Sequence, residues 1–196
     1  MVFHPPDFEA LLARLARELR ARQLGFMLIG GQAVLLHGRP RLTEDIDLTL
    51  AVGPEDLARV LEACRNLDLQ PLPADVESFV RETFVLPAAE PVTGIRIDFI
   101  FSTIPYERAA IARAVRVRLR GVEVPFATAE DLLLHKLFAG RPRDLEDAAT
   151  IVRRQREKLD WQYLERWVGE FATVPGREGL PDLLRALRGE NSNGED

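Results

Sequence analysis

The sequence predicts an α/β (α+β) domain that is followed by a helical C-terminal section. Strand-like apolar runs alternate with amphipathic helical segments as far as about residue 126, whereas only helical patterns follow. The chain has 196 residues, and its 46% hydrophobic content suits one globular domain with a small extension. We therefore expect an α/β core over 1–126, a helical section packed on it over 127–188, and a disordered acidic tail over 189–196.

The chain begins with patterns of an amphipathic helix and a buried strand. Residues 7–24 place apolar side chains at helical spacing, and Gly25 follows at the position where a helix would stop. The apolar run 26–29 ends at Gly30-Gly31, as is typical of a buried strand. The elements expected next are a short helix over 32–37, a strand over 46–52 and a helix from 53 to about 65.

The remaining elements change from strands to helices along the chain. We expect the core to end with strands over 78–88 and 94–101, a helix over 105–114 and a hairpin over 115–126. Two helix-start signals mark the C-terminal section, because Thr128 opens a capping-box pattern and Asp160 has the position of an N-cap. Helices are expected there over about 129–139, 142–158, 161–171 and 178–188.

Composition excludes several classes of protein. Cys64 is the only cysteine, so neither a disulfide framework nor a cysteine metal site is expected. No apolar run approaches the length of a membrane span, and the N-terminus lacks the order of a signal peptide, so we expect a cytoplasmic protein without a membrane partner. The net charge of −5 argues against a protein that coats nucleic acid with its whole surface.

Two aspartates lie at the strand expected over 46–52, although aspartate is depleted from strands. Asp45 and Asp47 are two residues apart, so both side chains point to the same side of a strand. Two ionised carboxylates on one rigid surface repel each other unless a cation lies between them, and oxygen-only ligands favour Mg²⁺ or Mn²⁺. The alternative is a solvated strand end that carries two acids.

A third carboxylate comes from the strand expected over 94–101. Asp98 shares one face of that strand with Arg96 and Ile100, and the other face is apolar. If the strand is a neighbour of 46–52, Asp98 completes a three-carboxylate cluster that can hold two metal ions. The alternative is an exposed strand residue without a role in chemistry.

The glycine pair before the aspartates has a second possible role. A strand, then Gly30-Gly31, then a helix places free backbone N–H groups and a helix N-terminus where a polyphosphate can bind. The alternative is a tight strand-to-helix turn that needs glycine for its backbone dihedrals.

Together these features resemble the polymerase-β-like nucleotidyltransferase superfamily. Its signature is an apolar strand, a Gly-Gly or Gly-Ser pair, a short helix, Asp-x-Asp on the next strand and a third acid on a later strand. The corresponding residues are Gly30-Gly31, Asp45-Ile46-Asp47 and Asp98. The resemblance implies a nucleotidyltransferase fold, in which a mixed β-sheet is flanked by helices.

Within this superfamily, the chain is similar to the AbiEii-type branch, which is known for toxins of type IV toxin–antitoxin systems. That branch shows Gly-Gly-x-Ala, then Arg-x-Thr-x-Asp-Ile-Asp-Leu, and later a lysine followed by a helix with Arg-x-Lys-Asp-x-x-Asp. The matching residues are Arg41, Thr43, Asp45 and Asp47, and then Lys136, Arg141, Asp144 and Asp147, with Arg143 where lysine is usual. The resemblance covers about residues 24–155.

The resemblance also implies which residues act. The catalytic set would be Asp45, Asp47, Asp98, Lys136 and Asp144, of which Asp45, Asp47 and Asp98 would be the metal ligands. The nucleotide would be bound by Gly30, Gly31, Arg41, Thr43 and Lys136. Lys136 would contact the triphosphate, since an ammonium is a compact point charge suited to phosphate. The alternative for the second motif is a surface lysine beside a helix start whose acids complement the helix dipole.

The implied activity is Mg²⁺-dependent transfer of a nucleoside monophosphate from a nucleoside triphosphate to an acceptor hydroxyl. RNA such as tRNA, or a protein, would supply that hydroxyl, and the chain would be a toxin with a cognate antitoxin. The alternative is an inactive nucleotidyltransferase-fold module that binds a nucleotide or a partner. Arg116, Arg118 and Arg120 form a basic strand face, which is either a track for RNA or a solvated surface.

Overall fold

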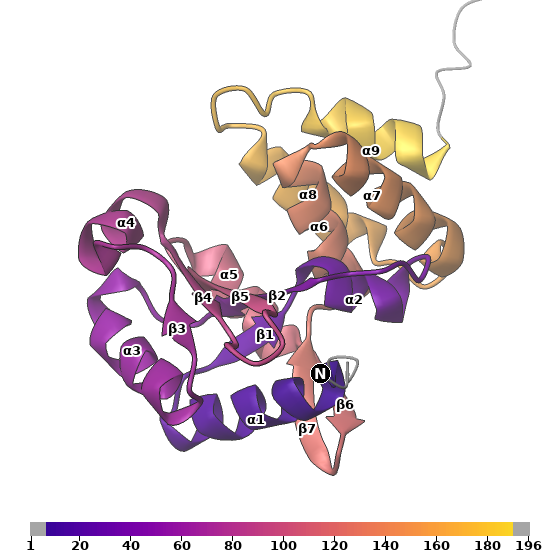
Figure 1. Cartoon of the computed structure of the whole chain (residues 1–196). Helices are drawn as coiled ribbons and strands as arrows, with labels where there is room; N and C mark the ends of the chain where they lie inside the picture. Colours follow the sequence, from indigo (N-terminus) through magenta and orange to yellow (C-terminus); the bar gives the residue numbers. More distant parts are fainter. Residues whose placement is uncertain (1–6, 190–196) are drawn as a thin grey trace, which may run out of the picture. The chain divides into compact units, whose positions relative to one another are not determined.

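The computed structural model describes residues 7–189 and has the predicted α/β architecture, with a seven-stranded mixed sheet and flanking helices (Figure 1). In chain order the elements are α1 (Phe8–Ala21), β1 (Phe26–Leu28), α2 (Gly30–His37), β2 (Asp45–Leu50), the 3₁₀ helix η1 (Pro54–Asp56), α3 (Leu57–Asn66), β3 (Gln70–Pro71), α4 (Val76–Thr83), β4 (Val85–Ala89), β5 (Arg96–Phe101), α5 (Pro105–Arg113), β6 (Val115–Leu119), β7 (Val122–Phe126), α6 (Ala129–Ala139), α7 (Pro142–Gln155), α8 (Trp161–Phe171) and α9 (Leu180–Arg188).

The described residues divide into two compact units. The first comprises 7–32 and 42–127 and contains the whole sheet, whereas the second comprises 33–41 and 128–189. Residues 33–41 therefore group with the C-terminal helices, although they precede the sheet's second strand in the sequence.

In the first unit the strand order is β3-β4-β5-β2-β1-β7-β6. The central strands β2 and β5 are parallel, as are β1 and β7, and the remaining neighbours are antiparallel. Helix α1 packs against β6 and β7, and α5 contacts β2 (Figure 1). Burial alternates along β5 and along the first four residues of β2. Ile46, Leu48 and Phe99 are fully buried, while Asp47 and Asp98 lie on the other face.

In the second unit α6 packs against α7, α8 and α9, and α8 also packs against α9 (Figure 1). The predicted caps form: the Thr128 hydroxyl accepts a hydrogen bond from the Asp131 amide, and the Asp160 carboxylate accepts one from the Tyr163 amide. The core of this unit contains a run of three buried leucines on α6, which are Leu132, Leu133 and Leu134.

The predicted strand over 78–88 is wrong in its first part, because residues Val76–Thr83 form helix α4. The Asp75 carboxylate caps this helix by accepting a hydrogen bond from the Ser78 amide, and Phe84 ends it in a left-handed conformation at φ 58°. Val76 and Val80 are four residues apart, which is helical spacing, and only the following segment Val85–Ala89 pairs in the sheet. Strand β3, which is two residues long, was not predicted.

Cys64 is buried on α3, and burial raises the pKa of its thiol to about 12, so it remains protonated and packs as an apolar side chain. Within residues 7–189, no helix has both the length and the hydropathy to cross a bilayer. Gly189 caps α9 in a left-handed conformation, and the rest of the predicted acidic tail, 190–196, lies outside the described residues.

Candidate functional site

The turn from β1 into α2 is shaped by two glycines that accommodate side chains from the segment around β2. Gly30 has a positive φ of 60°, and a Cβ on it would lie 2.7 Å from the Asp47 Cγ. A Cβ on Gly31 would lie 2.7 Å from the Thr43 Cβ. Both glycines are therefore required by close contacts: one makes room for the Asp47 carboxylate and the other for the Thr43 side chain.

Two hydrogen bonds fix this arrangement inside the first unit. The Ile29 amide donates to the Asp47 carbonyl at 2.9 Å, and this bond continues the β1–β2 pairing up to the glycine turn. The Thr43 hydroxyl donates to the Asp45 carbonyl at 3.3 Å. The Asp47 carboxylate consequently lies at the first residue of α2, where a helix N-terminus stabilises negative charge.

The pairing of β2 with β5 brings the predicted carboxylates onto neighbouring strands. Asp47 is directly opposite Asp98 in the parallel register, and Asp45 is opposite Arg96. Paired positions on adjacent strands project to the same face and are about 5 Å apart. The structure thus places Asp45, Asp47 and Asp98 on one face of the sheet. The sequence alone did not establish that their two strands are neighbours.

Arg96 lies beside this concentration of negative charge. The Arg96 Nε donates to Asp98 Oδ1 at 2.8 Å, while half of the Arg96 side chain (49%) is exposed. The Asp98 hydrogen bond raises the pKa of Arg96 against the opposing effect of burial, and the charges of Asp98, Asp45 and Asp47 raise it further. All three carboxylates therefore act on the same cation. The sequence pattern had placed Arg96 on the face of Asp98, but its pairing with that residue was not predicted.

The donor set suits a hard divalent cation. It consists of carboxylate oxygens only, which Mg²⁺ and Mn²⁺ prefer, and it carries three negative charges. In the conformation described for residues 7–189, no group of three or more histidine, cysteine, aspartate or glutamate side chains is arranged to hold a metal ion. A shared cation would therefore require the carboxylates to turn toward one another.

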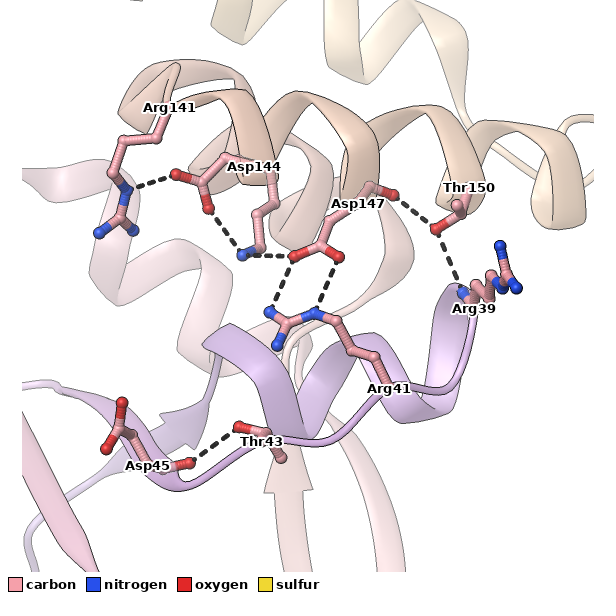
Figure 2. A network of polar contacts seen from close by, with 9 residues as sticks. Arg39, Arg41, Thr43, Asp45, Arg141, Asp144, Asp147 and Thr150 are labelled. Carbon is pink, nitrogen blue, oxygen red and sulfur yellow. Dashed lines mark hydrogen bonds and ion pairs between the residues drawn. The ribbon is translucent and has the colours of Figure 1, made fainter.

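The residues of the second predicted motif form a buried ionic network inside the second unit. Lys136 Nζ lies 2.8 Å from Asp144 Oδ1 and 2.9 Å from Asp147 Oδ2, and 8% or less of each of these side chains is exposed. Arg141 Nε donates to Asp144 Oδ2 at 2.6 Å. Figure 2 shows Asp144 and Asp147 one turn apart on α7, facing these partners. Lys136 is therefore an internal residue, in contrast to the alternative of a surface lysine.

Arg41 completes the network from the segment that follows α2. Its Nε donates to Asp147 Oδ1 at 3.1 Å and its Nη2 donates to Asp147 Oδ2 at 3.0 Å, so that the guanidinium holds the carboxylate at two points (Figure 2). Such two-point pairs are geometrically specific. This contact was not predicted from the sequence, where Asp147 and Arg41 are separated by 106 residues.

The network keeps both aspartates ionised. Burial raises the pKa of Asp144, but hydrogen bonds from Arg141 and Lys136 outweigh it and hold the pKa below its ordinary value. For Asp147, burial is likewise outweighed by hydrogen bonds from Arg41 and Lys136, and the pKa is again lowered. The two carboxylates are matched by three cations, so the buried charges compensate one another.

Comparison with solved structures defines the class of fold. An antigenic nucleotidyltransferase-like protein from Paracoccidioides brasiliensis is 17% identical, with a TM-score of 0.53 over 91% of this chain and 92% of that chain. The lincosamide antibiotic adenylyltransferase LnuA, solved with lincomycin bound, is 14% identical, with a TM-score of 0.50 over 73% of this chain and 95% of that chain. The fold is that of nucleotidyltransferases.

The family follows from the sequence. Residues 10–190 match the family described as nucleotidyl transferase AbiEii toxin, type IV toxin–antitoxin system, and the chain belongs to this family. A search of curated proteins finds no match. The resemblance inferred from the glycine and aspartate motifs is thereby confirmed.

Replacing Gly30 by alanine should displace the Asp47 carboxylate. Gly94 is the matched control, because it also has a positive φ (74°) but a Cβ there would meet no atom within 4 Å. Gly94→Ala should reduce the free energy of unfolding by about 1–2 kcal/mol through backbone strain alone. Gly30→Ala should cost more, and a crystal structure should show Asp47 moved. Equal costs with an unmoved Asp47 would contradict the proposed contact.

Removing the Lys136 charge should destabilise the second unit. Lys136→Met leaves Asp144 and Asp147 buried with one cation fewer, so we expect the free energy of unfolding in urea to fall by about 3 kcal/mol or more. Lys158→Met removes the charge of an exposed lysine in the same unit and should change it by less than about 0.5 kcal/mol. If both variants behaved alike, the network would not stabilise the fold.

Proposed function

We propose that the chain is a divalent-metal-dependent nucleotidyltransferase. It transfers a nucleoside monophosphate from a nucleoside triphosphate to an acceptor hydroxyl on RNA, such as tRNA, or on a protein. Membership of the AbiEii family and the nucleotidyltransferase fold support the reaction class. The observation that carries the proposal for the site is the paired register of Asp47 and Asp98 beside the glycine turn.

In this proposal the glycine turn binds the triphosphate. The first backbone N–H groups of an α-helix have no intrahelical acceptor, so those at the start of α2 can donate to phosphate oxygens. Glycine at positions 30 and 31 lets the phosphates approach the backbone closely. Thr43 packs against Gly31 and holds the segment that leads into β2.

Asp45, Asp47 and Asp98 would hold Mg²⁺ or Mn²⁺, which when bound polarises the α-phosphate and lowers the pKa of the attacking hydroxyl. The acceptor oxygen forms a bond to the α-phosphorus, the bond from this phosphorus to the bridging oxygen breaks, and pyrophosphate leaves. Asp98 accepts the proton of the acceptor hydroxyl, because it is the carboxylate on the strand beside the pair on β2. Arg96 balances the carboxylates when no other cation is bound.

For Lys136, Asp144 and Arg41 we propose a supporting role. Their side chains are engaged with one another and with Asp147 inside the second unit. A contact of Lys136 with the triphosphate, as the family resemblance implies, would require it to leave two buried carboxylates. The energetic cost of uncompensated buried charge favours the supporting role.

The family description also suggests a biological role. We propose that the chain is the toxin of a type IV pair and that a cognate antitoxin opposes it. The second candidate function is an inactive module that binds a nucleotide or a partner, and it is favoured by one observation, the engagement of Asp98 by Arg96. These two functions differ in whether a nucleotide is consumed.

A transfer assay tests the proposal. The full chain is incubated with each α-labelled nucleoside triphosphate, Mg²⁺ and either total RNA or total protein, and label is followed into the acceptor. Asp47→Ala should reduce incorporation by more than about 100-fold, because it removes a proposed metal ligand. Asp182→Ala, which changes an exposed aspartate on α9, should leave incorporation unchanged.

The outcomes separate the candidate functions. Incorporation that is unchanged in Asp47→Ala would contradict the assignment of the carboxylates. Absence of incorporation with every triphosphate, together with stabilisation of the fold by a triphosphate, would favour the inactive nucleotide-binding module. Incorporation that is lost when Mg²⁺ and Mn²⁺ are chelated supports the metal-dependent reaction.

A further inference from the structure

The second unit contains a pocket of about 530 Å³ that none of the predicted catalytic carboxylates lines. One wall is the segment after α2, with Arg39, Pro40 and Arg41, and the other wall is α7, which includes Glu146 and Arg153. The volume falls within the range of about 300–1,000 Å³ that is usual for small-molecule sites.

The two walls are held in place by contacts within the unit. The Arg39 amide donates to the Thr150 hydroxyl at 3.1 Å, and this hydroxyl donates to the Asp147 carbonyl at 2.8 Å (Figure 2). Arg154 donates to the Gly38 carbonyl, and Arg41 holds Asp147 at two points. The pocket is therefore preorganised, so little ordering of the backbone would accompany binding.

The charge of the lining is positive. Arg39, Arg41 and Arg153 line the pocket together with Asp147. Lys136 and Arg41 balance the Asp147 carboxylate, so Arg39 and Arg153 supply the remaining positive charge. Glu146 is the remaining acid of the lining. Arg39 and Arg153 are exposed, and in Figure 2 the Arg39 guanidinium points away from Thr150.

We propose that this pocket binds phosphate groups. The planar fork of an arginine matches two phosphate oxygens, and arginines from two separate segments can hold one phosphate from both sides. Pro40 and Ala149 add apolar surface on which a ribose or base can rest. The phosphate belongs either to an RNA strand or to a free nucleotide, and this inference goes beyond the proposed transfer reaction because it needs neither the carboxylates nor a metal.

Binding of two probes to the full chain tests the inference. A short fluorescein-labelled oligouridine RNA is titrated by fluorescence anisotropy, and ATP is titrated by calorimetry, both in the presence of EDTA. The double variant Arg39→Ala/Arg153→Ala should weaken binding of at least one probe by about tenfold or more. For RNA, it should also reduce the slope of log K against log salt by about 1.4, since each phosphate contact of a single strand contributes about 0.7.

Two control variants test the effect of charge: one removes positive charge outside the pocket, and the other removes negative charge from its lining. Arg166→Ala/Lys158→Ala removes two exposed positive charges of the same unit outside the pocket and should have a small effect on binding. Glu146→Gln removes the acid of the lining and should strengthen binding. Asp182→Ala, which changes an exposed aspartate outside the pocket, should bind both probes as the original chain does. The transfer assay tests Asp47→Ala and the binding assay tests the pocket arginines without a metal, so a failure of transfer and a failure of this pocket remain distinguishable.

The two probes identify the source of the phosphate. Loss of RNA affinity alone assigns the pocket to an RNA backbone, loss of ATP affinity alone assigns it to a free nucleotide, and loss of both shows that it accepts either. The inference is overturned if neither probe binds the original chain. It is also overturned if the pocket variant and the control double variant weaken binding equally.

Discussion

The in-register parallel pairing of β2 with β5 is the constraint on which the candidate site depends. It places Asp47 opposite Asp98 and sets their apolar neighbours into the core, so shifting the register by one residue would exchange the two faces. The glycine turn follows from the antiparallel pairing of β2 with β1, which brings the Asp47 carboxylate into the space that a side chain on Gly30 would fill. A structural requirement of the sheet thus accounts for the spacing of the glycine and aspartate motifs.

The two units differ in how their carboxylates are paired and in how exposed the paired cations are. In the first unit the charges of three carboxylates act on Arg96, whose side chain is half exposed. In the second unit Asp144 and Asp147 are buried and fully matched by Lys136 and two arginines. The first arrangement is suited to binding and chemistry, and the second is suited to fixing α6, α7 and the segment after α2.

Local patterns in the sequence predicted most of the fold, because helix caps, glycines that end an element and the alternation of apolar residues each depend on only a few neighbouring residues. They predicted the shared face of Asp45 and Asp47, and that of Arg96 and Asp98. The helix at Val76–Thr83 was missed because four-residue spacing resembles alternation in a short segment. The contact of Arg41 with Asp147 and the pocket beside it depend on tertiary packing, which no local pattern records.

The central claim is that the three carboxylates form a site for a divalent cation. Titration with Mn²⁺, followed by electron paramagnetic resonance of the free ion, measures this directly and needs no nucleotide or acceptor. The account predicts that the original chain binds Mn²⁺ and that the double variant Asp47→Asn/Asp98→Asn does not, although it remains folded. Equal binding by both proteins, or no binding by the original chain, would contradict it.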